Sequence, residues 1–177
     1  SRKGRCPRCG RSRPKTFVTA NLYLPDGVSG PRGAVLFLCG HHELAKHAGE
    51  YQDVCQMLVQ AGLVVFAVDP IGQGERVSYR EADSAQGKVR WGTAEHDYAG
   101  SQCLPLGDAI ARYFLHDAMR AVDYMMTRPE IDPKKIGMTG NSGGGTQSSM
   151  MMMGDPRIAA AAPCTFIMNR ETYMYCG

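Results

Sequence analysis

The sequence predicts an α/β domain in which helices cover a mostly parallel β-sheet. Short, continuous apolar segments alternate along the chain with longer segments of helical periodicity, and strands that are connected through helices run parallel. The 177 residues, of which 44% are hydrophobic and 21% charged, have the composition of an ordinary globular protein. Disordered and fibrous classes are therefore excluded.

The predicted strands are short and mostly apolar. Residues 17–24 alternate apolar and polar positions and stop at the turn sequence Pro-Asp-Gly. The later strands are continuous apolar runs, as expected of strands that are buried on both faces. These later strands cover residues 34–39, 63–68, 136–139 and 158–162.

Three helices are predicted between these strands. Residues 50–61 carry apolar side chains at helical spacing and are followed by Gly62, which ends the helix. Residues 107–128 place an apolar stripe on one face, and residues 143–153 form the third helix. Residues 70–106, in which Gly, Ser and Asp are scattered, are predicted to be irregular.

The N-terminal residues differ from the rest of the chain. Residues 1–15 hold seven Lys or Arg and no acid, so the remaining residues carry a net charge of −4 although the whole chain carries +3. We predict a basic, disordered tail over residues 1–14 and a folded domain over residues 15–177, with no nucleic-acid partner for the acidic body. Cys6 and Cys9 have zinc-knuckle or redox spacing, but a closed zinc site needs four ligands and no second CxxC exists.

Membrane and secretory classes find no support. No apolar run approaches the roughly 18 residues that span a bilayer, and the start Ser1-Arg2-Lys3 is not a secretory signal. These features favour a cytoplasmic protein with no membrane partner, although a chain that starts without Met leaves room for a lost leader. Seven scattered cysteines, an odd number, predict a mostly reduced protein.

The stretch that carries chemistry is the G-x-S-x-G motif of residues 140–144, between a predicted strand and a predicted helix. A tight strand-to-helix turn exposes the hydroxyl of Ser142 at the edge of the sheet, and the flanking glycines let neighbouring backbone approach. The N–H of Gly143, at the helix N-terminus, can donate to a developing oxyanion. A P-loop needs a Lys after the glycines, and a dinucleotide loop needs Gly where Thr146 stands. The motif therefore predicts a nucleophile elbow with Ser142 as the nucleophile.

With this motif, the region from Phe17 to about Pro163 resembles the N-terminal two-thirds of an α/β-hydrolase domain. It is similar to bacterial acetylxylan esterase-like and prolyl-oligopeptidase-like hydrolases. The resemblance implies a serine carboxyl-ester hydrolase with no cofactor, acting on a small-molecule or carbohydrate ester, with a carbohydrate acetyl ester as the expected substrate. The resembling segments are residues 18–25, 69–76, 95–103, 120–124 and 140–147.

The resemblance also assigns further site residues. In α/β hydrolases the second oxyanion donor lies in the loop after an early strand, which makes the backbone N–H of His41 the candidate. His41 and His42 could instead bind a metal, but adjacent His residues rarely point at one ion, and no metal is predicted. The family's triad acid and His follow the serine, yet no His follows Ser142. The resemblance implies that residues 71–106 are a substrate-side loop, and His96 in this loop is the candidate substitute base. His116, in the middle of a predicted helix, is the weaker candidate. Asp155 is predicted to be a turn residue rather than the triad acid.

The chain stops after one strand beyond the elbow. We therefore expect a truncated α/β-hydrolase sheet, with the triad acid and His outside this chain, that is a poor esterase and a poor monomer alone. Self-association, or a chain that supplies the missing C-terminal part, is expected. The alternatives are a non-catalytic remnant or binding module, a peptidase of the same fold, and a nucleic-acid or zinc-binding module that depends on residues 1–15.

Overall fold

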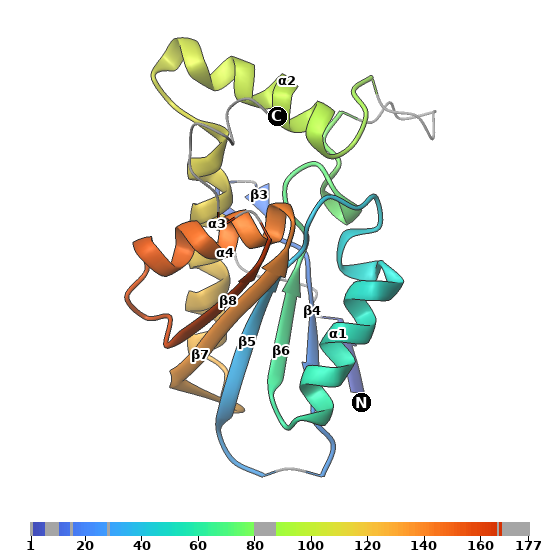
Figure 1. The fold of residues 1–177 in the computed structure, drawn as a ribbon, viewed down its shortest axis with the longest axis vertical. Helices are drawn as coiled ribbons and strands as arrows, with labels where there is room; N and C mark the ends of the chain where they lie inside the picture. The colour runs from blue at the N-terminus through green and yellow to red at the C-terminus, as the bar shows by residue number, and fades with distance from the viewer. Residues whose placement is uncertain are drawn as a thin grey trace.

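The computed structural model describes residues 2–5, 11–14, 16–27, 29–79, 88–165 and 167. Its centre is a six-stranded sheet with the order β1-β4-β6-β5-β7-β8 (Figure 1). The four strands β6, β5, β7 and β8 are parallel, whereas β4 is antiparallel to β6 and β1 is antiparallel to β4. The predicted α/β class is confirmed. The strands are β1 (Arg2–Arg5), β4 (Ala20–Leu24), β5 (Arg32–Leu38), β6 (Val64–Val68), β7 (Ile131–Asn141) and β8 (Ala160–Cys164).

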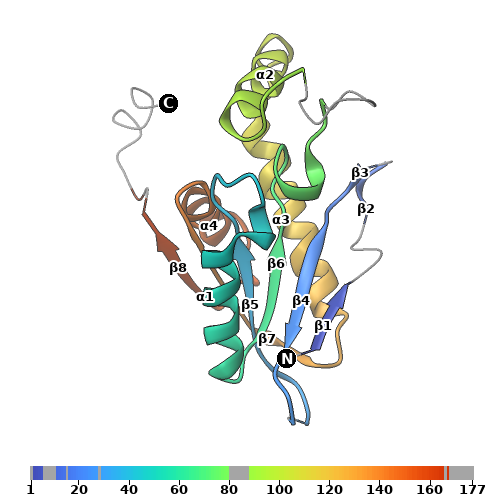
Figure 2. The same ribbon diagram turned by 90° about the vertical axis from the view of Figure 1, so that its right-hand side faces the viewer.

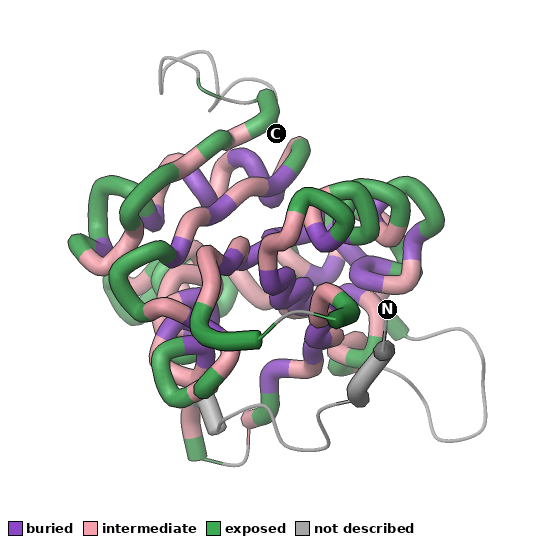
Figure 3. The backbone as a smooth tube through the Cα atoms, turned by 90° about the horizontal axis from the view of Figure 1, so that it is seen from below, coloured by how far each residue is buried: buried purple, intermediate pink, exposed green. Residues whose placement is uncertain are grey.

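Helices cover the sheet on both faces, because successive residues of each central strand point to opposite sides. Leu36 and Phe66 face the layer of α3 (Ile110–Met126) and α4 (Gly143–Gly154). Phe37 faces the other layer, which is formed by α1 (Gly49–Gln60). Figure 2 shows α1 and α3 on opposite sides of the strands, and Figure 3 shows the buried backbone in the middle of the molecule.

The region predicted to be irregular contains a helix. The 11-residue helix α2 (Thr93–Cys103) lies beyond the C-terminal ends of the parallel strands, between the 3₁₀ turns η2 (Gly74–Arg76) and η3 (Leu104–Leu106) (Figure 1). The prediction missed α2 because the helix has no apolar stripe: Glu95 is its one buried residue among those described. No helix in the described part of the chain is long and apolar enough to cross a bilayer.

The N-terminal segment also departs from the expected disordered tail. Residues 2–5 form β1, which pairs antiparallel with β4, and β2 (Arg11–Arg13) pairs with β3 (Thr16–Phe17). Pairing with β1 satisfies backbone hydrogen-bonding groups along the outer edge of β4. The sequence of β1 has no apolar pattern that would predict this strand. The predicted strand of residues 17–24 is therefore shorter in the structure. It begins at residue 20 as β4, and Phe17 belongs to β3 instead. Cys6 and Cys9 lie outside the described residues.

Candidate active site

Ser142 occupies the turn between β7 and α4, as the sequence predicted. β7 ends at Asn141 and α4 begins at Gly143. The backbone of Ser142 has φ 56° and ψ −122°, a conformation that non-glycine residues rarely adopt and that costs about 1–3 kcal/mol. The N–H of Ser142 donates to the carbonyl oxygen of Cys164 at 3.1 Å and to Oγ1 of Thr165 at 3.0 Å. The neighbouring strand therefore helps to hold the strained turn.

Two glycines allow the loop after β5 to lie directly against this turn. A Cβ atom on Gly40 would collide with the carbonyl oxygen of Asn141 and would lie 3.1 Å from Cβ of Ser142. A Cβ atom on Gly144 would collide with the carbonyl oxygen of Leu38. Any larger residue at position 40 or 144 would push the loop and the turn apart, so this close approach requires glycine.

The close approach brings two backbone donors to the elbow. Within the described residues, neither the N–H of His41 nor the N–H of Gly143 donates to another group. Gly143 is also the first residue of α4, whose N-terminus carries a partial positive charge. Two unpaired N–H groups beside a nucleophile can stabilise the negative oxygen of a tetrahedral intermediate. The assignment of Gly143 and His41 as oxyanion donors remains a prediction that this geometry supports.

The His41 side chain contacts a second histidine. Nε2 of His41 lies 3.1 Å from Nδ1 of His96, and Nε2 of His96 lies 2.7 Å from the carbonyl oxygen of Ile71. The ring of Phe114 packs edge-on against His96, with ring centroids 4.9 Å apart. Both nitrogens of His96 are therefore engaged, which argues against His96 as the base for Ser142.

Burial keeps the two imidazoles neutral near pH 7. Although part of His41 stays exposed, desolvation of its ring is the largest effect on its pKa and lowers it below the ordinary 6.5, and His96 lowers it further. Desolvation likewise lowers the pKa of His96. The carboxylate of Asp97 opposes both shifts with a smaller effect.

A buried ion pair anchors the loop that carries His41, and the sequence analysis did not assign it a role. Nζ of Lys46 contacts the carboxylate of Asp69, and both residues are 1% exposed. Lys46 also contacts Glu75 at 2.6 Å. Asp69 and Glu75 lie in the segment of residues 69–76, which the sequence analysis matched to the family. The match did not indicate what each residue of this segment does.

Gln73 adds a second anchor from the same segment. Its buried side-chain amide donates to the carbonyl oxygen of Gly40 at 2.7 Å and to that of His42 at 3.1 Å. These two carbonyl groups flank His41 in the chain. The amide therefore holds the backbone that carries the candidate oxyanion donor.

The remaining candidates have structural positions. Asp155 ends α4 and pairs with Arg157 at 2.5 Å, which lowers the pKa of the Asp155 carboxyl group. The 12 residues of α4 separate Asp155 from Ser142 by about 18 Å, so the prediction of a turn residue agrees with the structure. His42 accepts a hydrogen bond from the N–H of Leu44. The described part of the chain contains no group of three or more His, Cys, Asp or Glu side chains that could hold a metal ion.

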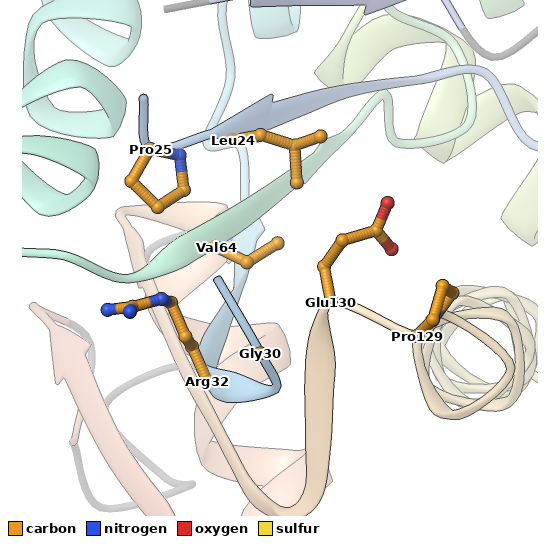
Figure 4. A pocket seen from close by; sticks show the side chains of 7 residues that line it. All are labelled: Leu24, Pro25, Gly30, Arg32, Val64, Pro129 and Glu130. Atoms are coloured by element: carbon orange, nitrogen blue, oxygen red, sulfur yellow. The ribbon is translucent and has the colours of Figure 1, made fainter. Parts of the chain in front are cut away.

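A cavity of about 190 Å³ lies at the end of the central strands that is opposite to Ser142. It is formed where β4 ends and where β5 and β6 begin (Figure 4). Its only charged lining residues are Arg32 and Glu130, and Glu130 is paired with Arg128 at 2.7 Å. The cavity is therefore not part of the candidate site.

Comparison with known families gives a match for the second part of the chain. Residues 109–176 match the model of the prolyl oligopeptidase family. This match includes the elbow, α3 and β8. Among curated proteins, no relative matches the chain.

Solved structures match most of the chain. A candidate acetyl xylan esterase from Bacteroides fragilis superposes with a TM-score of 0.69 and 23% identity, covering 85% of this chain and 42% of that protein. Acetyl xylan esterase 1 from Thermoanaerobacterium superposes with a TM-score of 0.57 and 21% identity, covering 82% of this chain and 43% of that protein. Est1E from Butyrivibrio proteoclasticus, with ferulic acid bound, superposes with a TM-score of 0.60 and 17% identity. The match covers 83% of this chain and 48% of that protein. The chain thus spans less than half of these proteins. It has the α/β-hydrolase fold, and the resemblance predicted from its sequence is confirmed at that level.

Proposed function

We propose that this chain carries the nucleophile and the oxyanion hole of a serine carboxyl-ester hydrolase. One observation carries the proposal: Ser142 stands at φ 56° between β7 and α4, beside two N–H groups that have no partner among the described residues. A strained serine in this turn is the arrangement that exposes a nucleophilic hydroxyl. The proposed substrate is a carbohydrate acetyl ester, which the similarity to acetyl xylan esterases supports.

The chemistry proceeds in two steps. Oγ of Ser142 forms a bond to the acyl carbon, its proton passes to a base, and the carbonyl electrons move to the oxygen that faces the N–H groups of Gly143 and His41. The bond from the acyl carbon to the alcohol oxygen then breaks, and the alcohol leaves with the proton. Water attacks the acyl-serine in the same way and releases the acid.

The proposal assigns the triad acid and the histidine base to residues outside this chain. Both ring nitrogens of His96 are engaged, and Asp155 is held by Arg157 at the far end of α4. The chain spans 42% of the Bacteroides protein, which leaves ample length elsewhere for both groups. The outer edge of β8, which pairs only with β7 in the described sheet, supports association with a further chain.

The test supplies hydroxide in place of the absent base. We expect the chain, incubated with p-nitrophenyl acetate at raised pH, to become acetylated on Ser142 and to release product slowly, below about 1 per second. Mass spectrometry of the peptides locates the acetyl group. p-Nitrophenyl butyrate is expected to react more slowly than the acetate, and a prolyl peptide ester tests the peptidase alternative that the family match raises.

The controls are two variants that each replace a serine by alanine, one in the turn and one within α4. Ser142→Ala is expected to abolish the acetylated peptide. Ser149→Ala, which removes a half-buried hydroxyl that donates to the carbonyl oxygen of Gly145 at 3.0 Å, is expected to leave the acetylation of Ser142 unchanged. Acetylation spread evenly over lysines and serines, with no preference for Ser142, would contradict the proposal.

A further inference from the structure

The His41–His96 pair connects the elbow to α2. A Cβ atom placed on Gly143 would lie 2.8 Å from Cε1 and 3.0 Å from Nδ1 of His41, but 3.6 Å from Nε2. The Cε1–Nδ1 edge of the ring therefore faces the first residue of α4. The opposite nitrogen, Nε2, faces His96, which α2 carries.

The hydrogen bonds determine which nitrogens carry protons. A carbonyl oxygen only accepts, so Nε2 of His96 must donate to Ile71. In a neutral ring the other nitrogen, Nδ1 of His96, then has no proton and accepts from Nε2 of His41. By the same rule Nδ1 of neutral His41 carries a lone pair, and no described residue donates to it.

We propose that His96 is a positioning residue that holds His41 in its neutral Nε2–H tautomer, so that the Nδ1 edge of the His41 ring faces Gly143 as a hydrogen-bond acceptor. The inference rests on the proposed function only in naming the substrate. An unprotonated Nδ1 suits an O–H group of water or of the substrate alcohol, and it gives no hydrogen bond to the oxyanion.

The surroundings of the pair support this arrangement. Phe114 of α3 fixes the plane of the His96 ring from an apolar side, and the ring contributes no charge. Gly92, just before α2, lies near the His41 ring, since a Cβ atom built on it would be 4.0 Å from Cδ2 of that ring. Asp97 is the acidic group that acts on both rings, and burial outweighs it. A first added proton therefore enters at Nδ1 of His41, the ring nitrogen that has no partner among the described residues.

The experiment reads the tautomers directly. Long-range ¹H–¹⁵N spectra of the ¹⁵N-labelled full chain at pH 7.5 are expected to show the Nε2–H tautomer for both His41 and His96. His96→Asn keeps an acceptor oxygen for His41 and is expected to retain the Nε2–H tautomer of His41. His96→Ala removes the acceptor and is expected to give a mixture of both tautomers. His47→Ala, which removes a half-buried imidazole outside the pair, is expected to leave the His41 signals unchanged.

Two results would overturn the inference. One is a proton on Nδ1 of His41 in the unmodified chain, and the other is an unchanged His41 tautomer in His96→Ala. If His96→Ala does not fold, the spectra of the unmodified chain and of His96→Asn decide between the tautomers. The readout needs no catalysis, so its failure refutes the positioning role alone, whereas failure of Ser142 to acetylate refutes the proposed function alone.

Discussion

Replacing Lys46 by methionine tests how strongly a buried ion pair fixes the loop that carries His41. Methionine keeps most of the length and apolar character of the lysine stem but removes its charge. The carboxylate of Asp69, which is 1% exposed, would then stay buried without its cation. Glu75, the other partner of Lys46, has a side chain that is 54% exposed and would remain solvated.

The expected loss of stability depends on the hydrogen bonds that Asp69 keeps once its cation is removed. Removal of one partner of a buried ion pair costs about 3–5 kcal/mol. Asp69 retains hydrogen bonds from Oγ1 of Thr19 at 2.6 Å, from the N–H of residue 46 at 3.2 Å and from the N–H of Glu75 at 3.3 Å. These bonds offset part of the cost, so we expect the lower end, about 3 kcal/mol. A loss of this size lowers the ratio of folded to unfolded chain by roughly 150-fold.

Urea denaturation followed by circular dichroism measures this loss. Lys135→Met is the matched control, because the Lys135 side chain is 71% exposed and lies 3.5 Å from Asp132, and it is expected to change stability by less than about 0.5 kcal/mol. The double variant Lys46→Met with Asp69→Asn, which removes both buried charges of this pair, is expected to recover part of the loss. A Lys46→Met chain within about 1 kcal/mol of the unmodified chain would refute the reasoning.

Two further predictions concern the site itself. Gly143→Ala places a methyl group 2.8 Å from Cε1 of His41, so the ring must move. We expect the acetylation rate of Ser142 to fall by up to about 100-fold, and an unchanged rate would show that the position of this ring does not affect the elbow. Stability is expected to decrease as pH is lowered from 7 to 5. The pKa values of His41 and His96 lie below 6.5 in the folded chain, so the unfolded chain binds protons first as pH falls below about 6.5. Urea midpoints across this range measure the effect, and a stability that stays constant or rises on acidification would contradict it.

Local sequence determined the elbow. The apolar run of β7, the G-x-S-x-G motif and the helix after it predicted the position of Ser142, because a strand-to-helix turn depends on residues adjacent in the chain. The order of strands and helices likewise predicted the parallel sheet, since right-handed crossovers restrict how such a chain can pair. The sequence could not reveal α2, whose polar surface has no apolar stripe, or β1, whose pairing depends on the free edge of β4.

By itself, then, the sequence determined the fold class, the place of Ser142 in the strand-to-helix turn and the glycines around it. Only the tertiary structure decided how His41, His96 and Ile71 meet, because their contacts join segments 25 and 55 residues apart in the chain. The same holds for Lys46 and Asp69, whose burial depends on the packing of a loop over the end of β6. Hydrogen bonds and ion pairs between distant segments leave no periodicity in a sequence, since their energy comes from desolvation and geometry that arise only once the sheet has formed.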